Sequence, residues 1–196
     1  MKYVLTRPDP FLLSLPERRD IMKRVMQSAT AFILILLLCS SCTYTTHADT
    51  QPYYLADVDL PKLTASQSVA IRNASPRAAG AEEVLCNYAR RDFVGSLYNF
   101  TESSISSTKN ALQRNNISLD DKAAKYLALN VDKATCERGS VSITLKTGMG
   151  NGAVKECSVK ERCGHIYAVT RCFEKAMELC VNQMLREKDI VEYLAH

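Results

Sequence analysis

The cysteines and histidines of this 196-residue chain are the side chains that could do nucleophilic, redox or metal chemistry. An even number of cysteines follows residue 80, which is consistent with disulfides in an exported domain and leaves their pairing open. One pairing is disfavoured, because Cys172 and Cys180 in a single helix would lie about 12 Å apart along its axis, beyond the roughly 7 Å reach of a disulfide. The six candidates are Cys86, Cys136, Cys157, Cys163, Cys172 and Cys180.

The spacing of these residues matches neither a zinc site nor a thiol–disulfide oxidoreductase. The intervals between the cysteines from Cys157 onward differ from those of zinc knuckles and ribbons, and no C-x-x-C pair occurs among the six. His47 and His196 lie near the two ends of the exported part, so a Cys–His system would have to use Cys163 and His165. We interpret His165 as a structural or exposed histidine, and we therefore predict no catalytic residue, no metal and no cofactor.

The stretch Met22–Cys42 has the order of charge, apolar run and small residues that is typical of a secretory signal. Lys23 and Arg24 open it, and the apolar run over 31–39 has 9 residues. A helix needs about 20 apolar residues to cross a bilayer, so the run is too short for a permanent span. The signal predicts export and excludes this stretch from the folded domain.

The end of the signal resembles the bacterial lipobox, in which a cysteine is lipidated and becomes the first mature residue. The residues that carry this resemblance are Leu38, Cys39, Ser40, Ser41 and Cys42, with Cys39 at a position where leucine is usual. The resemblance implies an acyl anchor, palmitate among its chains, at Cys42. The alternative is an ordinary cleaved signal with an incidental cysteine.

These features divide the chain into four parts. Residues 1–21 are interpreted as a mis-annotated extension, with translation starting at Met22, and residues 22–41 as the lipoprotein signal peptide. Residues 42–53 are polar and predict a flexible tether, which leaves 54–196 as the folded domain. Thr43 is not the aspartate that retains many lipoproteins at the inner membrane, so by that resemblance we expect the periplasmic face of the outer membrane.

The charge of the exported part argues against a nucleic-acid partner. Residues 1–41 contain 6 of the 25 Lys and Arg and 3 of the 21 Asp and Glu, so the remainder has a net charge of only +1. Nucleic-acid binding relies on concentrated positive charge that neutralises phosphates. We therefore expect the membrane, through the lipid anchor, and an envelope protein as partners, and no nucleic acid.

Apolar periodicity predicts an α+β two-layer sandwich, in which two main helices pack on an antiparallel sheet. Glycine-rich and Arg138-Gly139 turns separate the strands of a three-strand meander, and residues 80–89 fit a helical turn or a loop. Thr101 is the expected N-cap of the first helix, Asn115-Asn116 its stop, and Gly95 the position of a bulge. The expected strands are 56–60, 69–71, 93–98, 127–131, 141–145 and 153–159, and the expected helices are 101–114 and 167–187 with an amphipathic tail at 190–194.

The order of these elements resembles the YajG-like family of bacterial lipoproteins. The resemblance is carried by the paired short strands near Ala56–Arg72, by the helix ending in LQRNNI, and by the C-terminal helix with its tail KDIVEYLAH. It implies an α/β lipoprotein domain whose activity is not established, and only the lipidated cysteine carries over, to Cys42. The six other cysteines depart from what the family leads us to expect.

The sequence thus predicts a lipid-anchored, non-enzymatic envelope lipoprotein that binds a partner. The first alternative is an accessory lipoprotein of an envelope lipid or lipopolysaccharide transport system, which would be favoured by an apolar groove between helix and sheet. The second alternative is a thiol-dependent envelope enzyme that uses Cys163 or another cysteine, which would require a free thiol in a cleft.

Overall fold

The computed structural model of the chain describes residues 44–48, 62–88, 91–137, 139–164 and 169–196. The expected extension, the signal peptide, Cys42 and the strand expected at 56–60 lie outside these ranges. In chain order the elements are β1 (Tyr44–His47), β2 (Ala70–Asn73), β3 (Glu83–Tyr88), β4 (Arg91–Gly95), α2 (Leu97–Arg114), β5 (Tyr126–Glu137), β6 (Ser140–Met149), β7 (Val154–Arg162), α3 (Val169–Arg186) and α4 (Lys188–Ala195).

The main sheet has the strand order β2-β5-β6-β7, and its last three strands form the predicted antiparallel meander. The strict alternation of buried and half-buried residues along β6 shows why the pattern could be read from the sequence, since only one face packs on the core. β2 adds to β5 in parallel, so the sheet as a whole is mixed. Gly139 and Gly152 turn the chain with φ of 76° and 86°, a conformation that favours glycine.

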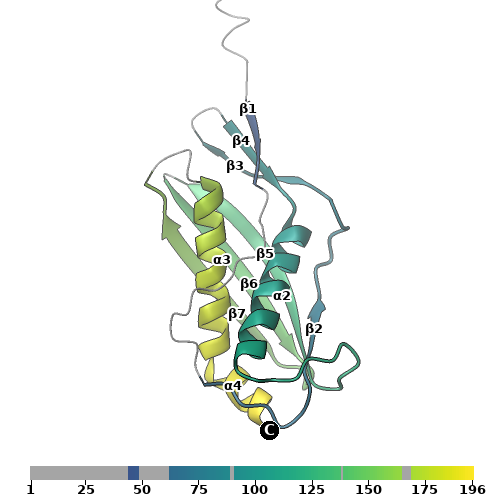
Figure 1. Cartoon of the computed structure of the whole chain (residues 1–196). Coiled ribbons are helices and arrows are strands. Elements are labelled where there is room, and N and C mark those ends of the chain that lie inside the picture. The colour runs from purple at the N-terminus through teal and green to yellow at the C-terminus, as the bar shows by residue number, and fades with distance from the viewer. Residues whose placement is uncertain (1–43, 49–61, 89–90, 138, 165–168) are drawn as a thin grey trace, which may run out of the picture. The chain divides into compact units, whose positions relative to one another are not determined.

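Two long helices cover one face of this sheet, which confirms the predicted α+β class (Figure 1). α2 packs on β5 and β2, whereas α3 packs on β6 and β7, and the two helices contact each other. Phe100 of α2 and Phe173 of α3 meet edge to face, with 5.6 Å between ring centroids. Burial of such aromatic pairs is worth more than their area alone.

A second, smaller sheet has the order β1-β4-β3 and corrects two expectations. Tyr44–His47 falls within the expected flexible tether, but it forms β1 and pairs in parallel with β4. Residues 80–89 were expected to be a helical turn or loop, but Glu83–Tyr88 forms β3, antiparallel to β4. Three polar or exposed positions hide the strand period of β3, and its pairing with β4, the next strand along the chain, decides the conformation.

The start of α2 also differs from the expectation. Ser96 caps the helix and its Oγ accepts a hydrogen bond from the N–H of Asn99, so Thr101 lies within the helix. The irregular register of the small sheet falls between Val84 and Cys86, and Gly95 is the last residue of β4 rather than a bulge. Asn116 ends the helix as expected, with φ of 60°.

Candidate functional site

Two disulfides join elements of the described part of the chain. Cys86 of β3 is bonded to Cys136 near the end of β5, with Cα atoms 5.4 Å apart, so it links the small sheet to the main sheet. Cys163 is bonded to Cys172 of α3, with Cα atoms 5.9 Å apart. These bonds are typical of a domain that folds in an oxidising compartment. The lipidation candidate Cys42 lies outside the described residues.

The disulfide between Cys163 and Cys172 involves one member of the Cys163–His165 pair that the sequence offered as a catalytic candidate. The Cys163 sulfur is bonded to Cys172 and is therefore not a free nucleophile in this structure. His165 lies outside the described residues, and His47 is an exposed residue whose Nδ1 lies 3.2 Å from Glu82 Oε1. The structure thus does not bring a reactive thiol and a histidine together among the residues it describes.

Cys157 of β7 and Cys180 of α3 are free thiols that face each other across the helix–sheet interface. Their Sγ atoms are 3.4 Å apart, and Cys180 Sγ also lies 3.4 Å from the carbonyl oxygen of Cys157. Their exposures are 6% and 0%, so neither thiol is presented to a substrate. The hydrogen bond from Cys180 lowers the pKa of Cys157, and the same bond together with burial raises the pKa of Cys180.

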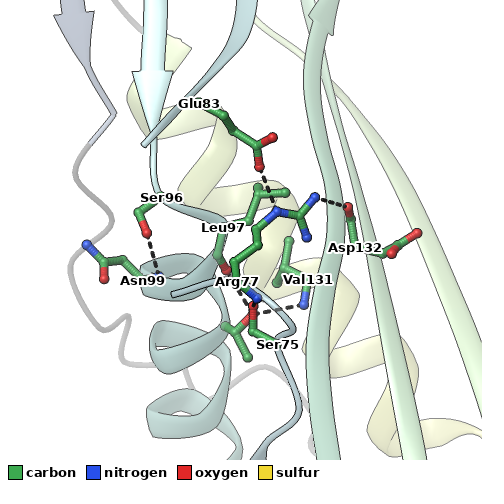
Figure 2. A network of polar contacts seen from close by, with 9 residues as sticks. Ser75, Arg77, Glu83, Ser96, Leu97, Asn99, Val131 and Asp132 are labelled. Atoms are coloured by element: carbon green, nitrogen blue, oxygen red, sulfur yellow. Dashed lines mark hydrogen bonds and ion pairs between the residues drawn. The ribbon is translucent and has the colours of Figure 1, made fainter. Parts of the chain in front are cut away.

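A polar network closes the edge of β5 beyond the end of β2 (Figure 2). β2 ends at Asn73, so the next polar backbone groups of β5 need other partners. The N–H of Val131 donates to Thr101 Oγ1 at 2.9 Å, and Arg77 Nη2 donates to the carbonyl oxygen of Asp132 at 3.3 Å. This is the segment where the register of β5 shifts, which leaves room for side chains to substitute for a strand.

Arg77 connects this network to the small sheet. Its Nε lies 2.9 Å from Glu83 Oε1 of β3, and Figure 2 shows the guanidinium between that carboxylate and the backbone of Asp132. Asp132 in turn pairs with Lys146 of β6 at 2.9 Å. The side chains of Arg77 and Glu83 are 30% and 45% exposed, so the pair organises the surface and adds little to stability.

The opposite end of the domain has a pocket of about 590 Å³ that we call the α4 pocket. Tyr193 of α4 fixes one wall, because its hydroxyl accepts hydrogen bonds from the N–H groups of Tyr126 and Gly150, each at 3.1 Å. Lys125 Nζ donates to the carbonyl oxygen of Leu194 at 3.0 Å. The lining residues are Lys125, Met149, Asn151, Ala153, Asp189, Glu192, Tyr193 and His196.

Charges of both signs line the α4 pocket. Asp189 forms an ion pair with Lys155 of β7, which holds the pKa of the carboxyl below its usual value and raises that of the amine. Gly150 permits the close approach of Tyr193, since a Cβ there would lie 2.7 Å from the tyrosine hydroxyl. In the sequence, Tyr193 belongs to an amphipathic tail that includes Asp189-Ile190. Its hydrogen bonds with Tyr126 and Gly150 could not be predicted from that pattern.

The interface between the helices and the main sheet is filled by side chains rather than hollow. The largest of its buried residues are at most 1% exposed and come from both layers. This packing counts against an acyl-chain groove between helix and sheet, the feature that would have favoured the transport alternative. The large buried residues of this interface include Phe100, Phe173, Leu112, Leu127, Leu129, Ile143, Leu145, Met184 and Leu185.

None of the helices in the described part of the chain combines the length and the apolar character that a membrane crossing requires. No group of three or more His, Cys, Asp or Glu side chains that could hold a metal ion occurs among the same residues.

Comparison with known proteins finds similarity only among solved structures, because the sequence matches no family model and no curated protein with which it was compared. The chain is similar to a Xanthomonas campestris protein of family DUF330, with 12% identity and a TM-score of 0.44 over 71% of this chain and 92% of that one. It is also similar to a candidate lipoprotein from Caulobacter crescentus, with 12% identity and a TM-score of 0.33 over 63% and 89%. Likeness at this level transfers neither activity nor partner. Neither protein is described as YajG-like, so that resemblance stays a prediction.

Proposed function

We propose that this protein is a bacterial envelope lipoprotein of the YajG-like type, anchored through Cys42, whose domain binds another envelope protein and does not catalyse a reaction. The observation that carries the proposal is the order of basic start, short apolar run, small residues and cysteine in Met22–Cys42. The disulfides support it, because such bonds persist outside the reducing cytosol. Thr43 favours the periplasmic face of the outer membrane.

The state of the thiols and the packing of the core favour a partner-binding function over a thiol-dependent enzyme and over a lipid-transport accessory. A thiol enzyme needs an exposed thiolate, whereas Cys163 is bonded and both Cys157 and Cys180 are buried. A lipid carrier needs an apolar cavity, whereas the space under α2 and α3 is filled. The α4 pocket offers fixed walls and paired charges at the surface, and these suit a polar protein partner.

Membrane fractionation of cysteine variants tests the anchor. Cys42→Ala should move the protein from the membrane pellet to the periplasmic fraction and abolish labelling by radioactive palmitate. Cys39→Ala is the matched control, because Cys39 would leave with the signal, and this variant should stay in the membranes and keep its label. A Cys42→Ala protein that still pellets after a salt wash, or an unlabelled wild type, would contradict the proposal.

Site-specific photo-crosslinking in cells tests the partner. A photoreactive residue in place of Asn151, on the wall of the α4 pocket, should give one discrete adduct with an envelope protein. The same residue in place of the exposed Gln113 on α2 is the control and should give no such adduct. Adducts of equal yield at both positions, or none at Asn151, would contradict a binding role for this pocket.

A further inference from the structure

We propose that Cys157 and Cys180 form a third disulfide, which joins β7 to α3 once the protein is in an oxidising compartment. The inference rests on the export part of the proposed function and is independent of lipidation at Cys42. The two sulfur atoms are 3.4 Å apart, and a disulfide requires about 2.05 Å, so a side-chain adjustment of roughly 1.4 Å closes the bond.

The positions of the two cysteines suit a cross-link between the layers. Cys157 faces the core from β7, opposite Leu145 of β6, and Cys180 projects from the buried face of α3. The Cys163–Cys172 disulfide already joins the residue after β7 to the first turn of α3. Because the chain runs along β7 and returns along α3, Cys157 and Cys180 lie further from the connection between the two elements than Cys163 and Cys172 do. The proposed bond would therefore be a second link between the same parts of the chain.

The contacts of the thiols favour oxidation over an inert buried pair. Cys180 Sγ lies within 3.8 Å of the carbonyl oxygen of Ile143 as well as within 3.4 Å of Cys157 Sγ, so the two sulfurs are held against each other by the backbone. The hydrogen bond from Cys180 lowers the pKa of the Cys157 thiol, and Cys157 is the more exposed of the two. Cys157 is thus the attacking thiol and Cys180 the resolving thiol.

Because both thiols are buried in the folded domain, the oxidant reaches Cys157 during folding or local opening of the interface between α3 and β7. This oxidant is a disulfide of low molecular mass or of a thiol–disulfide oxidoreductase. The Cys157 thiolate attacks one sulfur of that disulfide, and a mixed disulfide forms as the first thiolate leaves. Cys180 then loses its proton and attacks Cys157 Sγ, which breaks the mixed disulfide and releases the second thiolate. Two protein thiols are oxidised to one disulfide, and the oxidant is reduced to two thiols.

Peptide mapping without reductant tests the bond directly, because trypsin places the four neighbouring cysteines on separate peptides. Cleavage after lysine and arginine puts Cys157 on residues 156–160 and Cys180 on residues 176–186, whereas Cys163 and Cys172 fall on 163–171 and 172–175. Full-length protein from the cell envelope is denatured in excess N-ethylmaleimide, digested and analysed by mass spectrometry. We expect the peptide 156–160 linked to 176–186, with no maleimide on either.

Maleimide on both peptides of the unreduced protein, or a bond from Cys157 to a different cysteine, would overturn the inference. The map reads these two cysteines irrespective of Cys42, so a failed membrane fractionation leaves the result intact. A second measurement uses purified Cys180→Ser protein with oxidised glutathione. Cys157 should then retain a glutathione adduct that the wild type resolves, and equal adduct on both proteins would count against Cys180 as the resolving thiol. If Cys180→Ser does not fold, the wild-type map alone decides.

Discussion

Thr101 Oγ1 accepts a hydrogen bond from the backbone N–H of Val131 at 2.9 Å and donates one to the carbonyl oxygen of Leu97 at 2.8 Å. One buried hydroxyl therefore serves both its own helix and the strand beneath it. Because β2 ends before this point, the threonine takes the place of the missing neighbour strand. The helix and the sheet are thus held in a fixed relation by a polar contact inside an apolar layer.

Replacement of Thr101 by valine should destabilise the domain by about 1–3 kcal/mol, because the N–H of Val131 would remain buried without an acceptor. Thermal unfolding followed by circular dichroism measures the change. Thr108→Val is the matched control, since Thr108 is equally buried and its hydroxyl donates to the carbonyl oxygen of Ser104 in the same helix. Equal losses in the two variants would show that the contact with Val131 contributes nothing of its own.

The same substitution at Thr147 should have the opposite sign. Thr147 is 1% exposed on β6, and its hydroxyl has no hydrogen-bond partner within the described residues. Valine has nearly the same shape and suits a strand, so Thr147→Val should stabilise the domain by roughly 1 kcal/mol. Urea unfolding at equilibrium measures the difference, and a loss of stability would reveal a partner for the hydroxyl.

An aspartate at Leu145 should cost roughly 4 kcal/mol or more. Leu145 is 1% exposed and faces α3 from the centre of β6, so the charge would be buried without a partner. Thr144→Asp places the same charge on the opposite, half-buried face and should cost less than about 1 kcal/mol. Denaturant unfolding measures both variants. If they unfold at the same denaturant concentration, our assignment of Leu145 to the buried face of the sheet is wrong.

Gly150 and Tyr193 should be energetically coupled. In Gly150→Ala the new Cβ meets the tyrosine hydroxyl, and a shift of the ring breaks the bonds to Tyr126 and Gly150, which should cost about 1–2 kcal/mol. Tyr193→Phe removes the hydroxyl at a cost of about 1 kcal/mol and makes space for the methyl group. The double variant should therefore be more stable than the sum of the single losses predicts, by at least about 0.5 kcal/mol.

Additive losses in that cycle would mean that the ring of Tyr126, which also lies near the added Cβ, and not the hydroxyl of Tyr193 limits position 150. Gly148→Ala is a useful control on the same hairpin. A Cβ there would lie 3.7 Å from Ala128 Cβ, at ordinary contact distance. Gly148→Ala and Tyr193→Phe should therefore show additive changes in stability, with no energetic coupling.

The Lys155–Asp189 pair should show itself in the titration of Asp189. Because the folded-state pKa of this carboxyl is lowered, its contribution to stability is present above its usual value of 3.8 and is lost as the pH falls through the lower folded-state value. Lys155→Met should raise the pKa of Asp189 toward 3.8 in an NMR titration. Lys175→Met, which removes the partner of Glu161, should leave it unchanged.

The meander could be predicted from the sequence because each strand buries one face, so apolar residues recur at every second position of Val141–Leu145. The stripe of α3 was equally visible, since Phe173, Ala176 and Cys180 share its buried side. In both elements the spacing of apolar residues along the sequence follows directly from which side of the element faces the core.

Only part of β4 was predicted in the small sheet, because its strands are short and β1 pairs with a distant segment. β1 has only 4 residues, and its conformation depends on β4, which follows it by more than forty positions. The N-cap was misplaced because Ser96 and Thr101 are both good capping residues, and only the packing of Leu97 and Phe100 decides between them. Disulfide pairing likewise depends on which elements become neighbours in the fold, and the spacing of the cysteines along the sequence does not reveal this.

The bond between Cys86 and Cys136 also determines what a protease can release. It closes a ring of covalently connected chain that contains the basic doublet Arg90-Arg91, a substrate for trypsin. A cut at the doublet would leave two fragments that still migrate as one species on a gel run without thiol. Only a reducing agent would separate them, so a nicked molecule in the envelope would keep both halves.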